Sequence, residues 1–265
     1  MKKKPLISVV MNCFNGEKFL NQAIESLKYQ TYKNWELIFW DNKSNDNSKK
    51  IIKKFKDKRI KYFCSKKFQS LYKARNEAIK KTKGELISFL DTDDYWNKKF
   101  ISIFLKKFRK EKAEIVFSKY YTYNEKKKKR KINANILLSK TVTTQNLLDK
   151  YIVGISAIMI KKKIFKKNKF NNKFNIIGDF DLFIKLSKNY NFYTINEPLL
   201  TYRIHDENFS IKNLKMYLDE LNFWMRSNKL KLLKNMNIKK LKFLIFKLKI
   251  KLLLQKISLS FNCKN

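Results

Sequence analysis

Three carboxylates lie within four positions of the segment FLDTDDYW, residues 89–96. Asp91, Asp93 and Asp94 directly follow an apolar run and precede an aromatic pair. Asp94 could cap a helix that begins at YWNKKF, which is a common role for a carboxylate. Alternatively, the cluster could hold Mg²⁺ or Mn²⁺, which one or two carboxylates bind together with substrate phosphates. A calcium loop is excluded, because its ligands spread over about twelve residues with Gly at the sixth.

Strand-like runs precede this cluster and two other polar segments. LISVVM (6–11), WELIFW (35–40) and ELISFL (85–90) alternate with amphipathic, helix-like segments. This alternation predicts an α/β fold, with crossover connections and a mainly parallel central sheet flanked by helices. Parallel strands end at one edge of a sheet, where such folds bind ligands. We therefore expect the polar segments that follow these strands to meet there; they are residues 12–16, 41–48 and 91–94.

The second half of the chain is less regular. Residues 113–123 and 151–162 are strand-like, and KKKKRK (126–131) is typical of an exposed turn. A helix is expected after Gly178, and the chain is helix-like from about residue 211 onward. We predict one domain over 1–210 and a helical, Lys/Leu-rich extension over 211–265.

Taken together, these motifs resemble the inverting family 2 glycosyltransferases, which have a GT-A fold. The matching segments are PLISVVMNCFNGEKFLNQAIESLKYQTYKNWELIFWDNKSNDNS (5–48), ARNEAIKKTKGELISFLDTDDYW (74–96), GDFDLFIKL (178–186) and YRIHDENFS (202–210). The resemblance leaves out the tail, and its motifs are specific in combination. It implies a nucleotide-sugar donor, a nucleotide-binding half over 1–120 and an acceptor-binding half over 121–210. The chain resembles in particular the family members that assemble bacterial cell-surface polysaccharides, which implies a glycan or lipid-linked acceptor.

The resemblance assigns a base-binding role to the first two polar segments. Asp41 matches the acid that hydrogen-bonds the nucleotide base, and Phe14 and Asn15 match residues that line the base pocket. The second loop departs from the family's usual DDGS, because Asn42 replaces the second Asp and Lys43 replaces the Gly.

The acidic cluster matches the family's DxD motif. The resemblance implies that Asp91 contacts the ribose and that Asp93 binds Mn²⁺ or Mg²⁺, with Asp94 as an alternate ligand. His205 matches a position that in some relatives reaches the metal or the diphosphate, although a lone His is more often structural. Arg75 could approach the diphosphate or could be a solvated helix residue.

Asp179 matches the family's catalytic base. Gly178 stands where the family usually has Glu, a departure that bears on acceptor binding. Asp181 competes for the same role, but two residues apart on a helix means roughly 200° of rotation. The two carboxylates therefore cannot both point into one site, and an acid in the first turn is favoured by the helix dipole alone.

The chain carries 62 Lys and Arg against 22 Asp and Glu, a formal net charge of +40. This excess favours an anionic partner, or it reflects the codon bias of an AT-rich genome, which places Lys at exposed positions. In residues 229–261, apolar residues recur every three or four positions, and lysines occupy many of the positions between them. They could form an amphipathic helix on an anionic membrane surface, or a helix packed on the domain with its lysines in water. Three distant cysteines and the absence of a long apolar run predict a cytoplasmic protein, either free or peripheral on the inner face of the membrane.

Three other functions are compatible with parts of the sequence. A nucleic-acid-binding protein would explain the charge but not the carboxylates near the binding edge, so no nucleic-acid partner is expected. A dinucleotide-dependent oxidoreductase would need a GxGxxG motif, which the chain lacks. A non-catalytic relative would bind nucleotide sugars without turnover. We predict a metal-dependent inverting glycosyltransferase.

Overall fold

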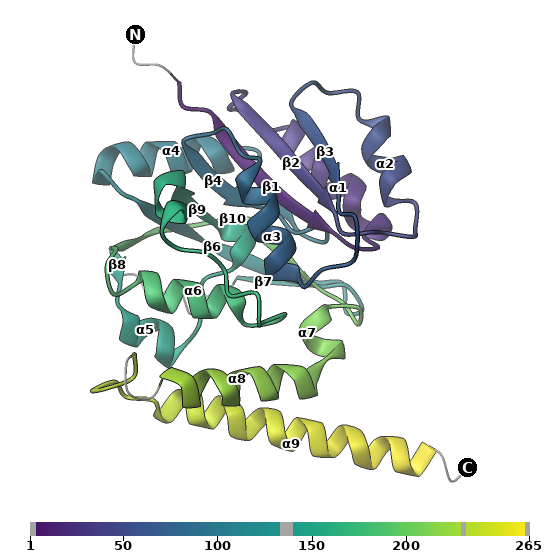
Figure 1. Cartoon of the computed structure of the whole chain (residues 1–265), viewed down its shortest axis with the longest axis vertical. Coiled ribbons are helices and arrows are strands. Elements are labelled where there is room, and N and C mark those ends of the chain that lie inside the picture. Colours follow the sequence, from purple (N-terminus) through teal and green to yellow (C-terminus); the bar gives the residue numbers. More distant parts are fainter. Residues whose placement is uncertain (1–3, 133–139, 229–231, 263–265) are drawn as a thin grey trace.

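The computed structural model of the chain describes residues 4–132, 140–228 and 232–262, with side chains described to residue 255 in the last helix. Its described strands form a ten-stranded sheet in the order β3-β2-β1-β4-β9-β6-β10-β5, with β7 paired to β6 and β8 paired to β10. Figure 1 shows helices packed against this sheet and two long helices beyond them. The strands are β1 (Ile7–Cys13), β2 (Trp35–Asp41), β3 (Ile60–Cys64), β4 (Leu86–Phe89), β5 (Tyr95–Trp96), β6 (Ile115–Asn124), β7 (Lys129–Ile132), β8 (Thr141–Val142), β9 (Ile158–Lys161) and β10 (Phe192–Ile204).

The first half of the chain is a parallel α/β unit. Strand β1 pairs in parallel with both β2 and β4, and β2 pairs in parallel with β3. Every residue of β2 is buried, as expected for a central strand covered on both faces. The crossovers contain α1 (Glu17–Lys28), α2 (Ser48–Lys54) and α3 (Leu71–Lys80). The predicted α/β fold with a mainly parallel sheet is confirmed.

Two hydrophobic layers cover the two faces of the sheet. Helices α1 and α4 (Phe100–Glu111) bury their apolar stripes against one face. Helices α3, α5 (Thr144–Asp149) and α6 (Gly178–Leu186) cover the other face together with α8 (Leu214–Asn228). Alternating side chains of β1 belong to the two layers, since Val9 and Met11 face the first and Val10 faces the second.

The second half contains antiparallel pairs that the sequence did not predict. Residues 151–162, expected to be one strand, instead contain a short 3₁₀ helix (Ile155–Ala157) and then β9, which lies antiparallel between β4 and β6. A second 3₁₀ helix, Lys162–Lys166, follows β9. The KKKKRK segment is not only a turn, because Lys129–Ile132 pairs antiparallel with β6 as an exposed edge strand. Backbone pairing at an edge needs no buried side chains, and lysines there discourage further strands from pairing.

The described residues of the C-terminal extension form three helices, α7 (Phe209–Lys212), α8 and α9 (Lys239–Asn262). Figure 1 shows α8 lying beside α6 and α9 lying along the far side of α8, at the margin of the molecule. Residues 229–231 lie outside the described residues, so the predicted amphipathic segment is described only from residue 232. No helix in the described part of the chain is long and apolar enough to cross a membrane.

Candidate active site

The carboxyl end of β2 holds Asp41 in a fixed orientation. Asp41 is 2% exposed and lies opposite Cys13 of β1 and Cys64 of β3 in the strand register. One carboxylate oxygen accepts the backbone N–H of Ser44 at 2.8 Å, and the other accepts the hydroxyl of Tyr62 at 2.7 Å. Each oxygen keeps a lone pair for a further donor.

The loop after Asp41 explains its own departures from the family pattern. The Asn42 amide donates to the carbonyl of Gln69 at 2.8 Å and accepts the backbone N–H of Gln69 at 3.1 Å. An Asp could not make the first of these bonds, because a carboxylate has no donor. Lys43 has a φ of 68°, a left-handed backbone conformation that a Gly would adopt without strain.

The loop after β1 interlocks with the loop after β2. The backbone N–H of Asn15 donates to the hydroxyl of Ser44 at 3.0 Å, and the Asn15 side chain accepts the N–H of Asn45 at 3.0 Å. Phe14 is 52% exposed, and its ring meets that of Phe68, itself 60% exposed, with 4.8 Å between centroids. This exposed aromatic pair could stack on a planar base, because aromatic faces hold bases with little sequence preference.

A buried arginine lies beside the first carboxylate of the acidic cluster. Arg75 is 1% exposed, so it is not the solvated helix residue that the sequence also allowed. Its guanidinium pairs with Asp91 at 2.8 Å and lies within 6 Å of the ring centroids of Tyr72, Phe89 and Phe170. Burial raises the pKa of Asp91 to about 6, even though Arg75 acts in the opposite direction.

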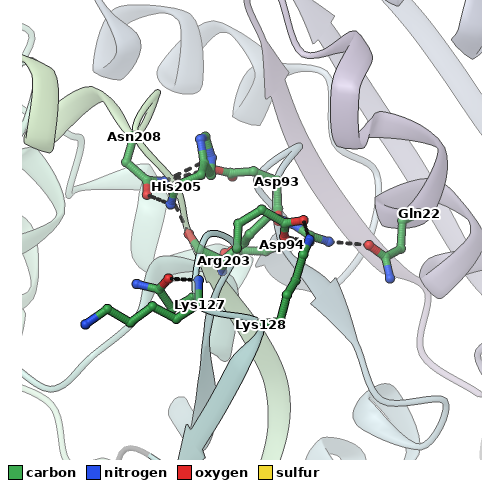
Figure 2. A network of polar contacts seen from close by, with 10 residues as sticks. Gln22, Asp93, Asp94, Lys127, Lys128, Arg203, His205 and Asn208 are labelled. Carbon is green, nitrogen blue, oxygen red and sulfur yellow. Dashed lines mark hydrogen bonds and ion pairs between the residues drawn. The ribbon is translucent and has the colours of Figure 1, made fainter.

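Asp93 meets two side chains from the loop after β10. One of its carboxylate oxygens lies 3.0 Å from Nε2 of His205 and accepts the Asn208 amide at 3.1 Å. Figure 2 shows these three side chains converging from the two loops. Asn208 also accepts the backbone N–H of His205 at 2.7 Å, which fixes the turn. The structure thus brings Asp93 and His205 together.

Asp94 points away from this group and into the protein. It is 2% exposed, and its carboxylate accepts the backbone N–H of Arg203 at 3.1 Å. Burial raises the pKa of Asp94 well above its usual range, with Asp93 and Asp91 adding to the effect. The Arg203 guanidinium donates to the carbonyl of Asp93 at 3.0 Å, pairs with Glu125 at 2.5 Å and contacts Gln22. Figure 2 shows Arg203 beneath the acidic loop, which it fixes to the rest of the sheet edge.

Asp179 lies in the first turn of α6 and approaches the acidic cluster from the other side. Its carboxylate accepts the Tyr72 hydroxyl at 3.0 Å and the N–H of Phe180 at 2.8 Å. Burial raises the pKa of Asp179, while the charge of Arg75 lowers it. The charge of Asp179 in turn raises the pKa of Asp91, so the two carboxylates share one electrostatic environment with Arg75.

Gly178 gives Tyr72 room to reach Asp179. A Cβ atom on Gly178 would lie 2.4 Å from Cδ2 of the Tyr72 ring, which is buried. The Tyr72 hydroxyl also donates to the carbonyl of Ile176 at 2.9 Å. The Glu that the family usually has at this position would therefore collide with the ring that orients the neighbouring Asp.

Helix α8 holds α6 in place from below. The Glu220 carboxylate accepts the backbone N–H groups of residues 175, 176 and 177 at 2.6, 3.0 and 3.1 Å, directly before α6 begins. Asp181 is 1% exposed, accepts the indole N–H of Trp224 at 2.8 Å and pairs with Lys185 at 2.7 Å. Asp181 therefore joins α6 to α8, while Asp179 faces the acidic cluster.

Sequence reasoning missed the residues that support this site. Asn208 carried a weak signal, since it lies three positions after the single His. Tyr72, Arg203 and Glu220 carried none, because each acts on residues more than 40 positions away in the chain.

The comparison with protein-family models decides the family. The model of glycosyl transferase family 2 matches residues 8–186, which is about two thirds of the chain. The chain belongs to this family. It is a glycosyltransferase, and the resemblance stated from its sequence is confirmed.

Relatives and solved structures agree with this assignment. Over 221 residues, the chain is 28% identical to the Escherichia coli UDP-Glc:alpha-D-GlcNAc-diphosphoundecaprenol beta-1,3-glucosyltransferase WfgD, with 82% of this chain and 85% of that protein covered. Residues 1–349 of S. aureus TarS, in complex with UDP-GlcNAc, superpose with a TM-score of 0.70 at 17% identity, covering 89% of this chain and 68% of that one. The mannosyltransferase PcManGT of Pyrobaculum calidifontis, in complex with GDP-Man and Mn²⁺, gives 0.62 at 12% identity, covering 85% of this chain and 65% of that one. These two likenesses show the GT-A fold.

Proposed function

We propose that this glycosyltransferase moves a sugar from a nucleotide-sugar donor to a glycan or lipid-linked acceptor, with inversion at the anomeric carbon. The observation that carries the proposal is the placement of Asp179. Although Asp179 and Asp91 are far apart in the chain, Arg75 pairs with Asp91, and its charge acts to lower the pKa of both carboxylates. A nucleotide site and a basic carboxylate at one edge of the sheet are the two components that sugar transfer needs.

The donor would bind across the carboxyl ends of β1, β2 and β4. Asp41 has lone pairs for the N–H of a base, and the Phe14–Phe68 pair offers aromatic faces beside it. Asp91 would accept a ribose hydroxyl, and Arg75 behind it would hold that carboxylate in place. TarS and PcManGT were solved in complex with UDP-GlcNAc and GDP-Man, which supports a donor of this class.

Asp93 and His205 would hold a divalent cation of the Mg²⁺ or Mn²⁺ type. Within the residues that the structure describes, no three His, Cys, Asp or Glu side chains form a metal-binding group. One carboxylate with a nearby imidazole suits a cation that substrate phosphates complete. The Nδ1 atom of His205 has no hydrogen-bond partner within the described part of the chain, and Phe19 packs 4.9 Å from the ring, which leaves Nε2 directed at Asp93. Bound there, the cation would neutralise charge that develops on the diphosphate as its bond to the sugar breaks.

Asp179 would act as the general base. Its carboxylate would take the proton from an acceptor hydroxyl, whose oxygen attacks the anomeric carbon in line with the departing nucleoside diphosphate. The new bond forms on the face opposite to the one that breaks, so the configuration inverts. The raised pKa of Asp179 suits this step, because a more basic carboxylate takes a proton more readily.

The relatives support a proposal for the acceptor class and the place of action. WfgD acts by its name on GlcNAc linked to diphosphoundecaprenol, a lipid-linked sugar. We propose an acceptor of the same class, used in the assembly of a cell-surface polysaccharide. The enzyme would then work at the cytoplasmic face of the membrane.

A panel of nucleotide sugars tests the donor side of this proposal. We expect one donor to raise the melting temperature in the presence of Mn²⁺, and a chelator to abolish most of that increase. Slow hydrolysis of the same donor should be measurable without acceptor. The proposed function is wrong if no nucleotide sugar stabilises the protein and the protein hydrolyses none of them. In that case Asp93→Asn would change neither the melting temperature nor the hydrolysis rate.

A further inference from the structure

Helix α9 has two apolar faces on opposite sides. The inner face packs on the core, where Leu241 is 3% exposed and Ile245 is 6% exposed. Leu244, Leu248 and Leu252 pack against the same cluster and are half-buried. This face already accounts for the position of α9 on the domain.

The outer face of α9 consists of Phe243, Phe246, Ile250, Leu253 and Leu254, which are 42–60% exposed. At about 100° per residue, these five positions centre roughly 180° from the inner face. A helix that only packed on its own domain would carry polar residues there. Five large apolar side chains on one exposed helix face are therefore unexplained by the fold.

Two rows of lysines separate the outer face from the inner face. Lys242 and Lys249 lie on one flank, and Lys240, Lys247 and Lys251 lie on the other. All five are exposed. Long lysine side chains can place their stems along apolar surface while the ammonium groups extend outward.

The helix is attached to the domain in a fixed position. Gln145 of α5 donates to the carbonyl of Asn237 at 2.8 Å and accepts the N–H of the same residue at 3.0 Å, just before α9 begins. Lys240 pairs with Asp149 of α5 at 3.6 Å. Figure 1 shows α9 along the margin of the molecule with α8 between it and α6. The outer face is thus presented on the side away from the domain.

We propose that the outer face of α9 docks on an anionic lipid bilayer. Its aromatic and aliphatic side chains would enter the boundary between headgroups and acyl chains, and the two lysine rows would lie among the lipid phosphates. The net charge of +40 favours an anionic surface over a neutral one. A second copy of this chain is a poorer occupant, because pairing the outer faces would place lysine rows near lysine rows.

This docking would set the distance between the membrane and the catalytic base. Packed helices lie about 8–10 Å apart, so two such steps, from α9 to α8 and from α8 to α6, span roughly 15–20 Å. A lipid-linked acceptor would have to reach Asp179 over that distance, which suits a headgroup of diphosphate and sugar. Only this functional reading rests on the proposed function; the docking itself does not.

Sedimentation with lipid vesicles tests the proposal on the full chain. We expect binding to vesicles of phosphatidylglycerol and phosphatidylcholine, little binding to phosphatidylcholine alone, and weaker binding as salt rises. The combined variant Lys242→Gln, Lys247→Gln, Lys249→Gln should lose on the order of fivefold in affinity per lysine. The combined variant Phe243→Ser, Phe246→Ser, Leu253→Ser should lose roughly tenfold or more, because its side chains no longer bury apolar area in the lipid.

Matched variants control for charge and for exposed apolar area. Lys49→Gln, Lys50→Gln and Lys53→Gln on α2 remove the same charge elsewhere, and Ile132→Ser removes an exposed side chain on β7. Both controls should bind vesicles like the parent chain. Equal losses in the α2 and α9 lysine variants would overturn the proposal in favour of diffuse charge. The proposal would also be overturned if the parent chain did not bind vesicles. Two further results would overturn it: a dimer of the parent chain that the outer-face variant no longer forms, or binding of an acidic protein to the outer face in place of lipid.

Donor hydrolysis without vesicles separates this proposal from the proposed function. The α9 variants should hydrolyse the nucleotide sugar at the parent rate, because α9 contains none of the proposed site residues. Vesicle binding without any donor hydrolysis would leave the docking surface in place and remove the transferase mechanism.

Discussion

The two sides of the candidate site are built differently. On the donor side, Asp41 ends β2 and is held by the loop that follows it, and Asp91 and Asp93 lie in the loop that continues β4. On the acceptor side, Asp179 depends on Tyr72, which is 107 positions away. Its helix begins at a loop held by Glu220, which lies 43 positions beyond that loop's last residue.

This difference concerns the kind of structure that fixes each side. The donor side is part of the sheet edge and should keep its shape wherever the sheet is intact. The acceptor side depends on the packing of α3, α6 and α8 against one another. Substitutions in α8, which lies outside the residues matched by the family model, should therefore affect the acceptor side. We therefore expect variants to separate donor binding from turnover.

Replacing Asp179 with Asn should have the largest effect on turnover and should break the acceptor side alone. Loss of a general base costs about 10²–10⁴-fold in rate. Nucleotide affinity should remain within about twofold of the parent value, because Asp179 contacts α3 and not the loops after β1 and β2. Acceptor-dependent kcat and calorimetric nucleotide Kd are the two measurements. Equal losses in both would mean that the two sides are not separable.

Replacing Asp93 with Asn should break the donor side. We expect a loss of about 10²–10³-fold in kcat/KM, as for removal of one preorganised electrostatic partner. Nucleotide affinity should fall too, and its dependence on Mn²⁺ should disappear. Asp206→Asn, in an exposed position next to His205, is the matched control and should change neither value. A variant at Asp93 that still responds to Mn²⁺ would place the cation elsewhere.

The pH profile should report the acceptor side. Since burial raises the pKa of Asp179, this base becomes protonated at a higher pH than an ordinary Asp, for which the pKa is about 3.9. The rate should fall tenfold per pH unit below the raised pKa, with most of the activity retained above it. Acceptor-dependent kcat from pH 4 to 8 measures this limb. A limb at or below the ordinary value would mean that Asp179 is not the base, or is not buried during turnover.

The sequence predicted the positions of Asp41 and Asp91 at the sheet edge, because the signals for them are local. Strand-like runs followed by polar loops place Asp41 and Asp91 at one edge by the geometry of parallel sheets alone. The antiparallel β9 was missed because a short apolar run does not specify the direction of pairing. Glu220 was missed for a related reason, since no pattern around it indicates that its carboxylate meets three backbone N–H groups of a distant loop.

Glu220→Gln, a substitution in α8 outside the candidate site, tests whether α8 supports the acceptor side alone. A carboxamide has one acceptor oxygen and would direct N–H groups at the backbone donors that the carboxylate now accepts. We expect kcat to fall roughly tenfold and the free energy of unfolding to fall by about 1–3 kcal/mol, with nucleotide Kd unchanged. Asp219→Asn, exposed on the same helix, is the control for charge. A change in nucleotide Kd would show that α8 supports both sides alike.

Asn42→Asp should have the smallest effect, and it concerns the donor side alone. The change restores the acid that the family usually has, but a carboxylate would face the carbonyl of Gln69, to which the amide now donates at 2.8 Å. We expect nucleotide affinity to fall a few-fold and the free energy of unfolding to fall by about 1–3 kcal/mol, with kcat at saturating donor unchanged. The exposed Asn45→Asp in the same loop carries the same charge and should be neutral. If Asn42→Asp binds nucleotide as tightly as the parent chain, the base loop does not depend on this bond, and the local contacts of the donor side are more redundant than the single contacts that hold Asp179.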